Sequence, residues 1–185
     1  EIFTASLSQV ANHYKGQGTG HPIYTDAKTF FAEGTHFTEN MQMVLRDVVS
    51  RLKGDTTASA LKRLETGFGG GKTHTLIACL HLAMKGKELA PYVSAFIAAE
   101  NLPEPGTVDV VAIAGDAVPV KEARKTELKP YPLWTEIARQ LGGADLCKEV
   151  AEYTERLDSP DEAFFDRIFA GRKVLILIDE LAHYA

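Results

Sequence analysis

The stretch "LETGFGGGKTHTL", residues 64–76, places four glycines directly before a Lys-Thr pair. A loop between a strand and a helix can wrap a phosphate with its backbone N–H groups when side chains leave room and φ can be positive. The residues that meet both conditions are Gly67, Gly69, Gly70 and Gly71. Lys72 would then reach the β- and γ-phosphate oxygens, and the Thr73 hydroxyl would ligate Mg²⁺. The stretch therefore predicts a phosphate-binding loop, the Walker A motif.

The match to this motif is relaxed at its first position. The strict pattern GxxxxGK[ST] has glycine at position 66, where this chain has Thr66, and the first glycine follows at Gly67. A glycine-rich turn before an ordinary helix is the alternative for the loop taken alone.

A second motif, "VLILIDE", covers residues 174–180. An apolar run that ends in two acids is typical of a buried strand that brings carboxylates to its C-terminal edge, the Walker B motif. Asp179 would hold Mg²⁺ through water, and Glu180 would act as general base on the attacking water. The alternative is a strand followed by an acidic helix start, where the helix dipole favours Asp and Glu. Both motifs together, in this order, favour nucleotide binding.

The adjacent Asp-Glu indicates the branch of P-loop proteins with its own catalytic glutamate, which includes AAA+, RecA-like and STAND ATPases. No guanine-specific NKxD motif is present, so we expect ATP, with Mg²⁺, as the nucleotide. Alternation of strands and helices predicts an α/β protein with a mostly parallel sheet. We therefore expect a three-layer P-loop NTPase fold of the AAA+/RecA-like branch.

Periodicity and turn residues predict the elements around these motifs. The expected helices cover residues 2–14, 37–54, 73–89, 91–101, 132–143 and 159–172. The expected strands are 58–67, 107–116 and 173–185, and a polar connection is expected over 115–132. The expected helix ends are Thr38, Gly54, Gly142, Ser159, Pro160 and Gly171. We divide the chain into a helical lead-in, 1–54, and an ATPase core, 55–185.

The composition indicates an ordinary globular protein, and the formal net charge of −5 excludes an overall positive field for nucleic acid or an anionic membrane. Cys79 and Cys147 have no CxxC spacing, so we expect buried, reduced thiols in a cytoplasmic protein. No apolar run is long enough to cross a membrane. The chain begins at Glu1 and stops at Ala185, shortly after its most apolar run. We expect it to be a piece of a longer protein, truncated after the Walker B strand.

Other residues favour ordinary structural roles. His74 and His81 share a helix and are expected to be structural rather than metal ligands, although His74 could face the nucleotide's surroundings. Trp134 is expected in the core. The basic residues between 121 and 129 favour a solvated loop over contact with a phosphate backbone. His183 and Tyr184 favour packing of a helix start or a γ-phosphate sensor about equally.

The sequence resembles the domain of unknown function 499 family, large prokaryotic ATPases encoded beside DNA methylases or helicases in phage-defence clusters. The stretches that carry the resemblance are "TDAKTFFAEGTHFTENMQMVLRDVVSRLKGD", "LETGFGGGKTHTLIACLHLA", "LWTEIARQLGG" and "VLILIDELAHYA". In that family Thr at the first loop position is ordinary, which explains Thr66. The resemblance implies the same roles: Glu180 and Lys72 catalytic, Thr73 and Asp179 at the metal.

The residues expected to contact the nucleotide are Thr66, Gly67, Phe68, Gly69, Gly70, Gly71, Lys72, Thr73 and His74. The first hypothesis is an ATPase, an acid anhydride hydrolase that drives motion or remodelling in a larger defence-associated machine. The second is a nucleotide-gated regulatory or scaffold module with little hydrolysis. Further partners would be other subunits of a defence complex, a second copy of the chain, or DNA, for which the sequence has no binding signature.

Overall fold

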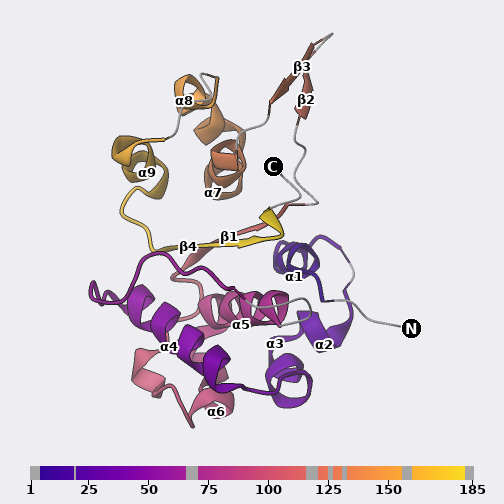
Figure 1. Ribbon diagram of the computed structural model, residues 1–185, viewed down its shortest axis with the longest axis vertical. Coiled ribbons are helices and arrows are strands. Elements are labelled where there is room, and N and C mark those ends of the chain that lie inside the picture. The colour runs from indigo at the N-terminus through magenta and orange to yellow at the C-terminus, as the bar shows by residue number, and fades with distance from the viewer. Residues whose placement is uncertain are drawn as a thin grey trace. The chain divides into compact units, whose positions relative to one another are not determined.

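The computed structural model describes residues 5–18, 20–65, 71–115, 121–124, 127–130, 133–155 and 160–181, with side chains of 121–130 and 154–155 outside the description. The chain forms two compact units, Glu1–Val108 and Asp109–Ala185 (Figure 1). The lead-in helix over residues 39–53 and the helix after the glycine loop pack on each other, so both sides of position 54 belong to the first unit.

The described part of the first unit consists of helices and connecting loops. The helices are α1 Leu7–Tyr14, α2 Pro22–Thr25, α3 Ala27–Thr29, the π-turn η1 Phe30–Gly34, α4 Glu39–Lys53, α5 Lys72–Lys85, η2 Gly86–Leu89, α6 Ala90–Val93 and η3 Ala99–Asn101. Helices α1 and α4 both pack against α5. The predicted helices 2–14, 37–54 and 73–89 are therefore confirmed over their described cores.

Helix α4 begins and ends where the sequence predicts. The Thr38 side chain accepts a hydrogen bond from the Met41 N–H at 3.3 Å, and Gly54 closes the helix in the left-handed conformation at φ 113°. Its buried residues Met41, Leu45, Val49 and Leu52 recur every three or four positions. This spacing forms one apolar stripe, which buries the helix against its neighbours.

Helix α5 is the centre of the first unit. Seven consecutive residues are buried: Ile77, Ala78, Cys79, Leu80, His81, Leu82 and Ala83. The sequence predicted one apolar face, but a run of this length covers the full circumference of a helix. The α5 helix is therefore enclosed on all sides over its second half.

Two predicted elements of the first unit differ from the structure. The residues 58–65 form no strand; Leu61 is 83% exposed, and Lys62 forms an ion pair with Asp47 of α4. Charged Lys62 and Arg63 interrupt the apolar pattern that a buried strand needs. The predicted helix 91–101 is divided: α6 ends at Val93, a turn follows, and η3 completes the segment.

The second unit contains the parallel strands β1 Asp109–Ala114 and β4 Val174–Asp179, and the antiparallel strands β2 Lys121–Arg124 and β3 Glu127–Pro130. Its helices are α7 Leu133–Glu149, α8 Ala151–Glu155 and α9 Glu162–Phe169. In β1 and β4 the register runs from Asp109↔Val174 to Ala114↔Asp179. The predicted strands 107–116 and 173–185 are thus confirmed over the paired residues, and their pairing is parallel, as expected for the sheet.

Helices cover one face of the β1–β4 pair. Figure 1 shows α7 and α9 on one side of the two strands. Val111 and Ile113 of β1 share a core there with Phe164 of α9, and Ile176 and Ile178 of β4 pack against it. Successive side chains of a strand point to opposite faces. Asp179 therefore lies on the other face, together with buried Leu177.

Several further predictions for this unit need correction. The connection 115–132 contains the β2–β3 pair, and β4 is mostly half-buried, with Leu177 its one buried residue. Asp161 caps α9 by accepting from the Phe164 N–H at 2.9 Å, whereas Ser159 lies outside the described residues. An aspartate directly before the first turn satisfies its N–H groups.

The observed ends of α9 and of the predicted helix 132–143 also differ by one residue from the predicted ends. Helix α9 ends at Phe169, and its cap residue Ala170 adopts a left-handed φ of 47° before Gly171 at 72°. Helix α7 is interrupted at Gly143 (φ 65°, ψ −153°) rather than closed at Gly142. Glycine tolerates these angles because it has no Cβ. The glycines thus indicated correctly that a helix ends or is interrupted in each region, but each predicted end was one residue away from the observed one.

The cysteines are both free thiols, Cys79 buried and Cys147 only half-buried. Burial raises the pKa of the Cys79 thiol to about 12. Over the described segments, no helix combines the length and the apolar character needed to cross a membrane.

Candidate functional site

The start of α5 carries the described part of the glycine loop. Gly71 adopts the left-handed conformation (φ 73°, ψ 18°), and a Cβ built on it would meet no atom of the described residues within 4 Å. Its carbonyl accepts from the Thr75 N–H and from Thr75 Oγ1, both at 2.9 Å. Lys72 and Thr73 follow in the first turn and are half-buried. We call Gly71, Lys72, Thr73 and His74 the lysine end; Thr66, Gly67, Phe68, Gly69 and Gly70 lie outside the described residues.

The His74 side chain links the lysine end to the π-turn η1 and the residue after it. Its ring stacks on Phe30 with centroids 4.5 Å apart, and Nε2 lies 3.0 Å from Thr35 Oγ1. Because Thr35 Oγ1 donates to the Phe30 carbonyl at 2.7 Å, its hydroxyl oxygen accepts from Nε2–H of His74. Burial lowers the pKa of His74. The side chain is therefore a neutral anchor for the first turn of α5.

His81 lies on the same side of α5, two turns further on, and is fully buried. Its Nε2 is 2.8 Å from the Tyr24 carbonyl oxygen, and its Nδ1 is 2.7 Å from the Tyr14 hydroxyl. A carbonyl only accepts, so Nε2 carries the proton and Nδ1 accepts from Tyr14. Burial lowers the pKa of His81 to about 4 and raises that of Tyr14. The structural role expected for this histidine agrees with these contacts.

The end of β4 carries the acid pair, which we call the acid end. Asp179 is the last residue of the strand, and Glu180 follows in a left-handed conformation with φ 49°. The Glu180 N–H donates to Asp179 Oδ1 at 3.1 Å. Asp179 is half-buried and Glu180 exposed. A positive φ is uncommon for a residue with a Cβ, and such angles concentrate at functional sites.

Gly115, which follows β1, lies directly beside the acid end. Its N–H donates to the Asp179 carbonyl at 2.9 Å, and a Cβ built on it would lie 2.2 Å from the Glu180 carbonyl oxygen. The sequence indicated Gly115 only as the end of a strand. Its proximity to Glu180 depends on the β1–β4 register, which the sequence does not reveal.

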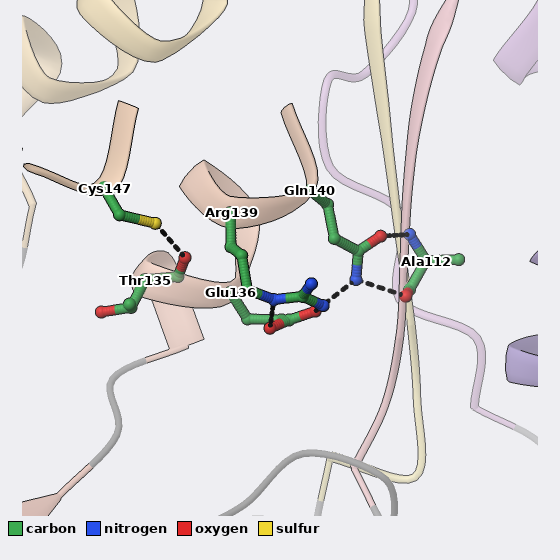
Figure 2. Close-up of polar contacts among 6 residues, drawn as sticks. All are labelled: Ala112, Thr135, Glu136, Arg139, Gln140 and Cys147. Atoms are coloured by element: carbon green, nitrogen blue, oxygen red, sulfur yellow. Dashed lines mark hydrogen bonds and ion pairs between the residues drawn. The ribbon is translucent and has the colours of Figure 1, made fainter. Parts of the chain in front are cut away.

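A polar network on α7 supports the strand that pairs with β4 (Figure 2). The Gln140 side chain accepts from the Ala112 N–H at 3.1 Å and donates to the Ala112 carbonyl at 2.9 Å. It also donates to Glu136 at 2.7 Å, and Arg139 forms an ion pair with the same carboxylate. The N–H groups of Asp109 and Gly115 donate to the carbonyls of Lys173, just before β4, and of Asp179. Because backbone groups alternate along a strand, those of Ala112 face the other edge of β1.

This network was not predicted, because one glutamine in a helix carries no signal of a strand contact. Trp134, predicted in the core, packs against the hydrophobic core of the second unit. Its indole N–H and the Thr135 hydroxyl are buried and have no hydrogen-bond partner among the described residues. The Cys147 thiol contacts the Thr135 carbonyl, with the sulfur 3.8 Å from the oxygen (Figure 2). Gln140 therefore supplies the hydrogen-bond partners that a neighbouring strand would otherwise supply to the Ala112 backbone.

The structure brings the predicted residues together in two groups. The lysine end occupies one helix start in the first unit, and the acid end occupies one strand end in the second unit. Within the described ranges, no group of three or more His, Cys, Asp or Glu side chains could hold a metal ion. His183, Tyr184 and the side chains of 121–129 lie outside the description.

Comparison with known proteins identifies one family. The search of curated proteins and the search of solved structures found no match. The family model described as the DUF499 N-terminal domain matches residues 8–185, which includes both the lysine end and the acid end. The chain therefore belongs to the DUF499 family, over its N-terminal domain.

Proposed function

We propose that this chain is an ATP-binding and Mg²⁺-dependent ATP-hydrolysing module of a larger prokaryotic machine with a role in phage defence or another DNA-linked process. The proposal includes a three-layer P-loop fold of the AAA+/RecA-like branch. The observation that carries it is the pair of motifs in their elements: a left-handed Gly71 leading into Lys72 and Thr73 at a helix start, and Asp179 and Glu180 at the end of a parallel strand.

The lysine end is suited to a phosphate. A helix start presents N–H groups without intrahelical partners and the positive end of the helix dipole. A Cβ at Gly71 would meet no atom of the described residues within 4 Å, so these residues leave an anion free to approach the backbone there. In the proposal Lys72 neutralises the terminal phosphates, and Thr73 offers a hydroxyl ligand to Mg²⁺.

The acid end is suited to a metal-bound water. Asp179 lies at the carboxyl end of a parallel strand, the edge at which α/β proteins bind ligands. In the proposal its carboxylate holds Mg²⁺ through water, and exposed Glu180 accepts a proton from the attacking water. An acid beside the metal ligand favours hydrolysis over simple binding.

Binding is tested by titrating the chain with Mg²⁺ and ATP in a calorimeter. We expect Lys72→Ala to weaken ATP binding on the order of 10- to 100-fold, because it removes one charge-assisted contact. Lys85→Ala is the matched control, because Lys85 lies at the opposite end of the same helix. Equal affinity in the wild-type chain and Lys72→Ala would contradict the proposal.

Turnover separates the two hypotheses. We expect Glu180→Gln to reduce kcat by about 100-fold or more while ATP binding is retained, since removal of a general base has this magnitude. Glu162→Gln, at the exposed start of α9, is the control. Binding without turnover in both the wild-type chain and Glu180→Gln would instead favour the nucleotide-gated regulatory or scaffold module.

A shared metal is tested by a double-mutant cycle. Thr73→Ala and Asp179→Asn should each raise the Mg²⁺ concentration needed for turnover, and the double variant should show less than the product of the two effects. Fully multiplicative effects would mean that the two side chains do not serve one Mg²⁺ ion. Stimulation of hydrolysis by added DNA would support a helicase or translocase role.

A further inference from the structure

Glu180 has a backbone conformation that residues with a Cβ rarely adopt. Its φ of 49° is left-handed, and the residue has a Cβ and an exposed side chain. Such a conformation persists where the surroundings impose it. One described residue close to its backbone is Gly115, which follows β1 on the neighbouring strand.

Gly115 and Glu180 meet backbone to backbone. A Cβ on Gly115 would lie 2.2 Å from the Glu180 carbonyl oxygen and 2.9 Å from its carbonyl carbon. The Gly115 N–H holds the Asp179 carbonyl at 2.9 Å, so the two strand ends cannot separate without losing this bond. Backbone atoms have no rotamer by which to avoid an added methyl group. Only glycine permits this approach.

We propose that Gly115 is the positioning residue of Glu180: the absence of a side chain at 115 lets the acid end adopt the backbone that directs Glu180 to its substrate water. This inference rests on the proposed function. Strand β1 is held on one edge by β4 and on the other by Gln140 at Ala112. An added methyl group at 115 therefore displaces the Glu180 backbone rather than β1.

The test is Gly115→Ala in the full chain, with steady-state ATP hydrolysis and ATP binding as readouts. A displacement of about 1 Å at a reacting group costs about 100-fold in rate. We expect kcat to fall by about that factor while KM and the affinity for ATP stay within about twofold. Trp134 packs against the second-unit core, so an unchanged unfolding transition by its fluorescence distinguishes this outcome from a variant that has only lost structure.

Ala144→Ser is the matched control in the same unit, because it also adds one heavy atom, but at an exposed position. We expect unchanged kcat and KM. A Gly115→Ala chain with kcat within about twofold of the wild type would overturn the inference, since a misplaced base must slow the reaction.

A double-mutant cycle with Glu180→Gln tests the link itself. If Gly115 acts through Glu180, adding Gly115→Ala to Glu180→Gln should reduce kcat no further. If Gly115→Ala reduced kcat by the same factor in the Glu180→Gln chain as in the wild type, the inference would be overturned and the proposed function would remain intact. A wild-type chain that neither binds nor hydrolyses ATP would instead overturn the proposed function, and the inference with it.

Ala114→Gly provides the second variant if Gly115→Ala fails to fold. It adds no atom but loosens the residue paired with Asp179. We expect kcat to fall several-fold, roughly 3- to 10-fold, with ATP affinity unchanged, because the acid end is less firmly held. Unchanged kcat in this variant would overturn the inference.

Discussion

The two units bury polar side chains on their central helices in opposite ways. In the first unit His81 of α5 is fully buried and neutral, with both ring nitrogens hydrogen-bonded. In the second unit Glu136 of α7 is 6% exposed and forms an ion pair, with Arg139 and Gln140 on its oxygens. A neutral ring tolerates complete burial, whereas a carboxylate requires a cation and further donors nearby.

This difference matters because each network supports one of the two groups of predicted residues. His81 holds α5, whose first turn is the lysine end, while Gln140 holds β1, which pairs with the strand of the acid end. The first network requires the neutral form of His81. The second requires the hydrogen bonds between Gln140 and the backbone N–H and carbonyl of Ala112. The two units should therefore respond differently to pH and to substitution.

The largest expected effect is the loss of the buried imidazole. His81→Ala leaves a cavity and removes the partner of the Tyr14 hydroxyl and the Tyr24 carbonyl, so we expect the free energy of unfolding to fall by about 3 to 5 kcal/mol. Urea denaturation followed by far-UV circular dichroism measures it. His36→Ala, at an exposed histidine, should stay within about 0.5 kcal/mol of the wild type. A loss below about 1 kcal/mol for His81→Ala would contradict the network.

The next effect is a pH dependence in the first unit. Burial lowers the pKa of His81 from 6.5 to about 4, so the unfolded chain binds the proton first as the pH falls. The stabilisation is complete above pH 6.5 and is lost toward pH 4. We expect the free energy of unfolding to fall by about 2 to 3 kcal/mol between about pH 7.5 and about pH 4.5 from this group.

His81→Gln should remove most of this pH dependence, because glutamine does not titrate in this range. His74, whose pKa burial also lowers, adds to the slope with the same sign. The measurement is the urea midpoint across the pH range for both chains. Identical slopes in the wild type and His81→Gln would show that His81 is not buried neutral.

A smaller effect is expected at the glutamine of the second unit. Gln140→Leu removes the partner of the Ala112 N–H and carbonyl, and we expect a loss of about 1 to 3 kcal/mol. Trp134 is the single tryptophan of the chain and packs against the second-unit core, so its fluorescence reports this transition. Gln9→Leu, at an exposed glutamine of α1, is the control. An unchanged midpoint would mean that Ala112 finds other partners.

The smallest effect is expected for an exposed ion pair on the same helix. Lys148 and Asp145 are separated by 3.4 Å, with side chains 79% and 96% exposed. Water and salt screen such a pair, so Lys148→Ala should change the free energy of unfolding by less than about 0.5 kcal/mol. The same fluorescence titration measures it. A change as large as that of Gln140→Leu would remove the contrast between buried and exposed polar groups.

Local chemistry made part of the fold predictable. The ends of α4 at Thr38 and Gly54 follow from side-chain and backbone groups within one helical turn. The strand over 174–179 follows from an unbroken apolar run, and the start of α5 at Lys72 follows from the glycine before it. The residues proposed to bind phosphate and metal were named on the same basis, and their chemistry stays a prediction.

Long-range contacts account for what the sequence did not reveal. His81 meets the hydroxyl of Tyr14 across 67 positions, and Gln140 meets Ala112 across 28. The segment 58–65 carries a weak strand pattern yet remains unpaired over its described length, since a strand also needs a neighbour. Gly115 was read as a turn residue. Its closeness to Glu180 arises from the register of two strands, because hydrogen bonding between them sets which residues face each other.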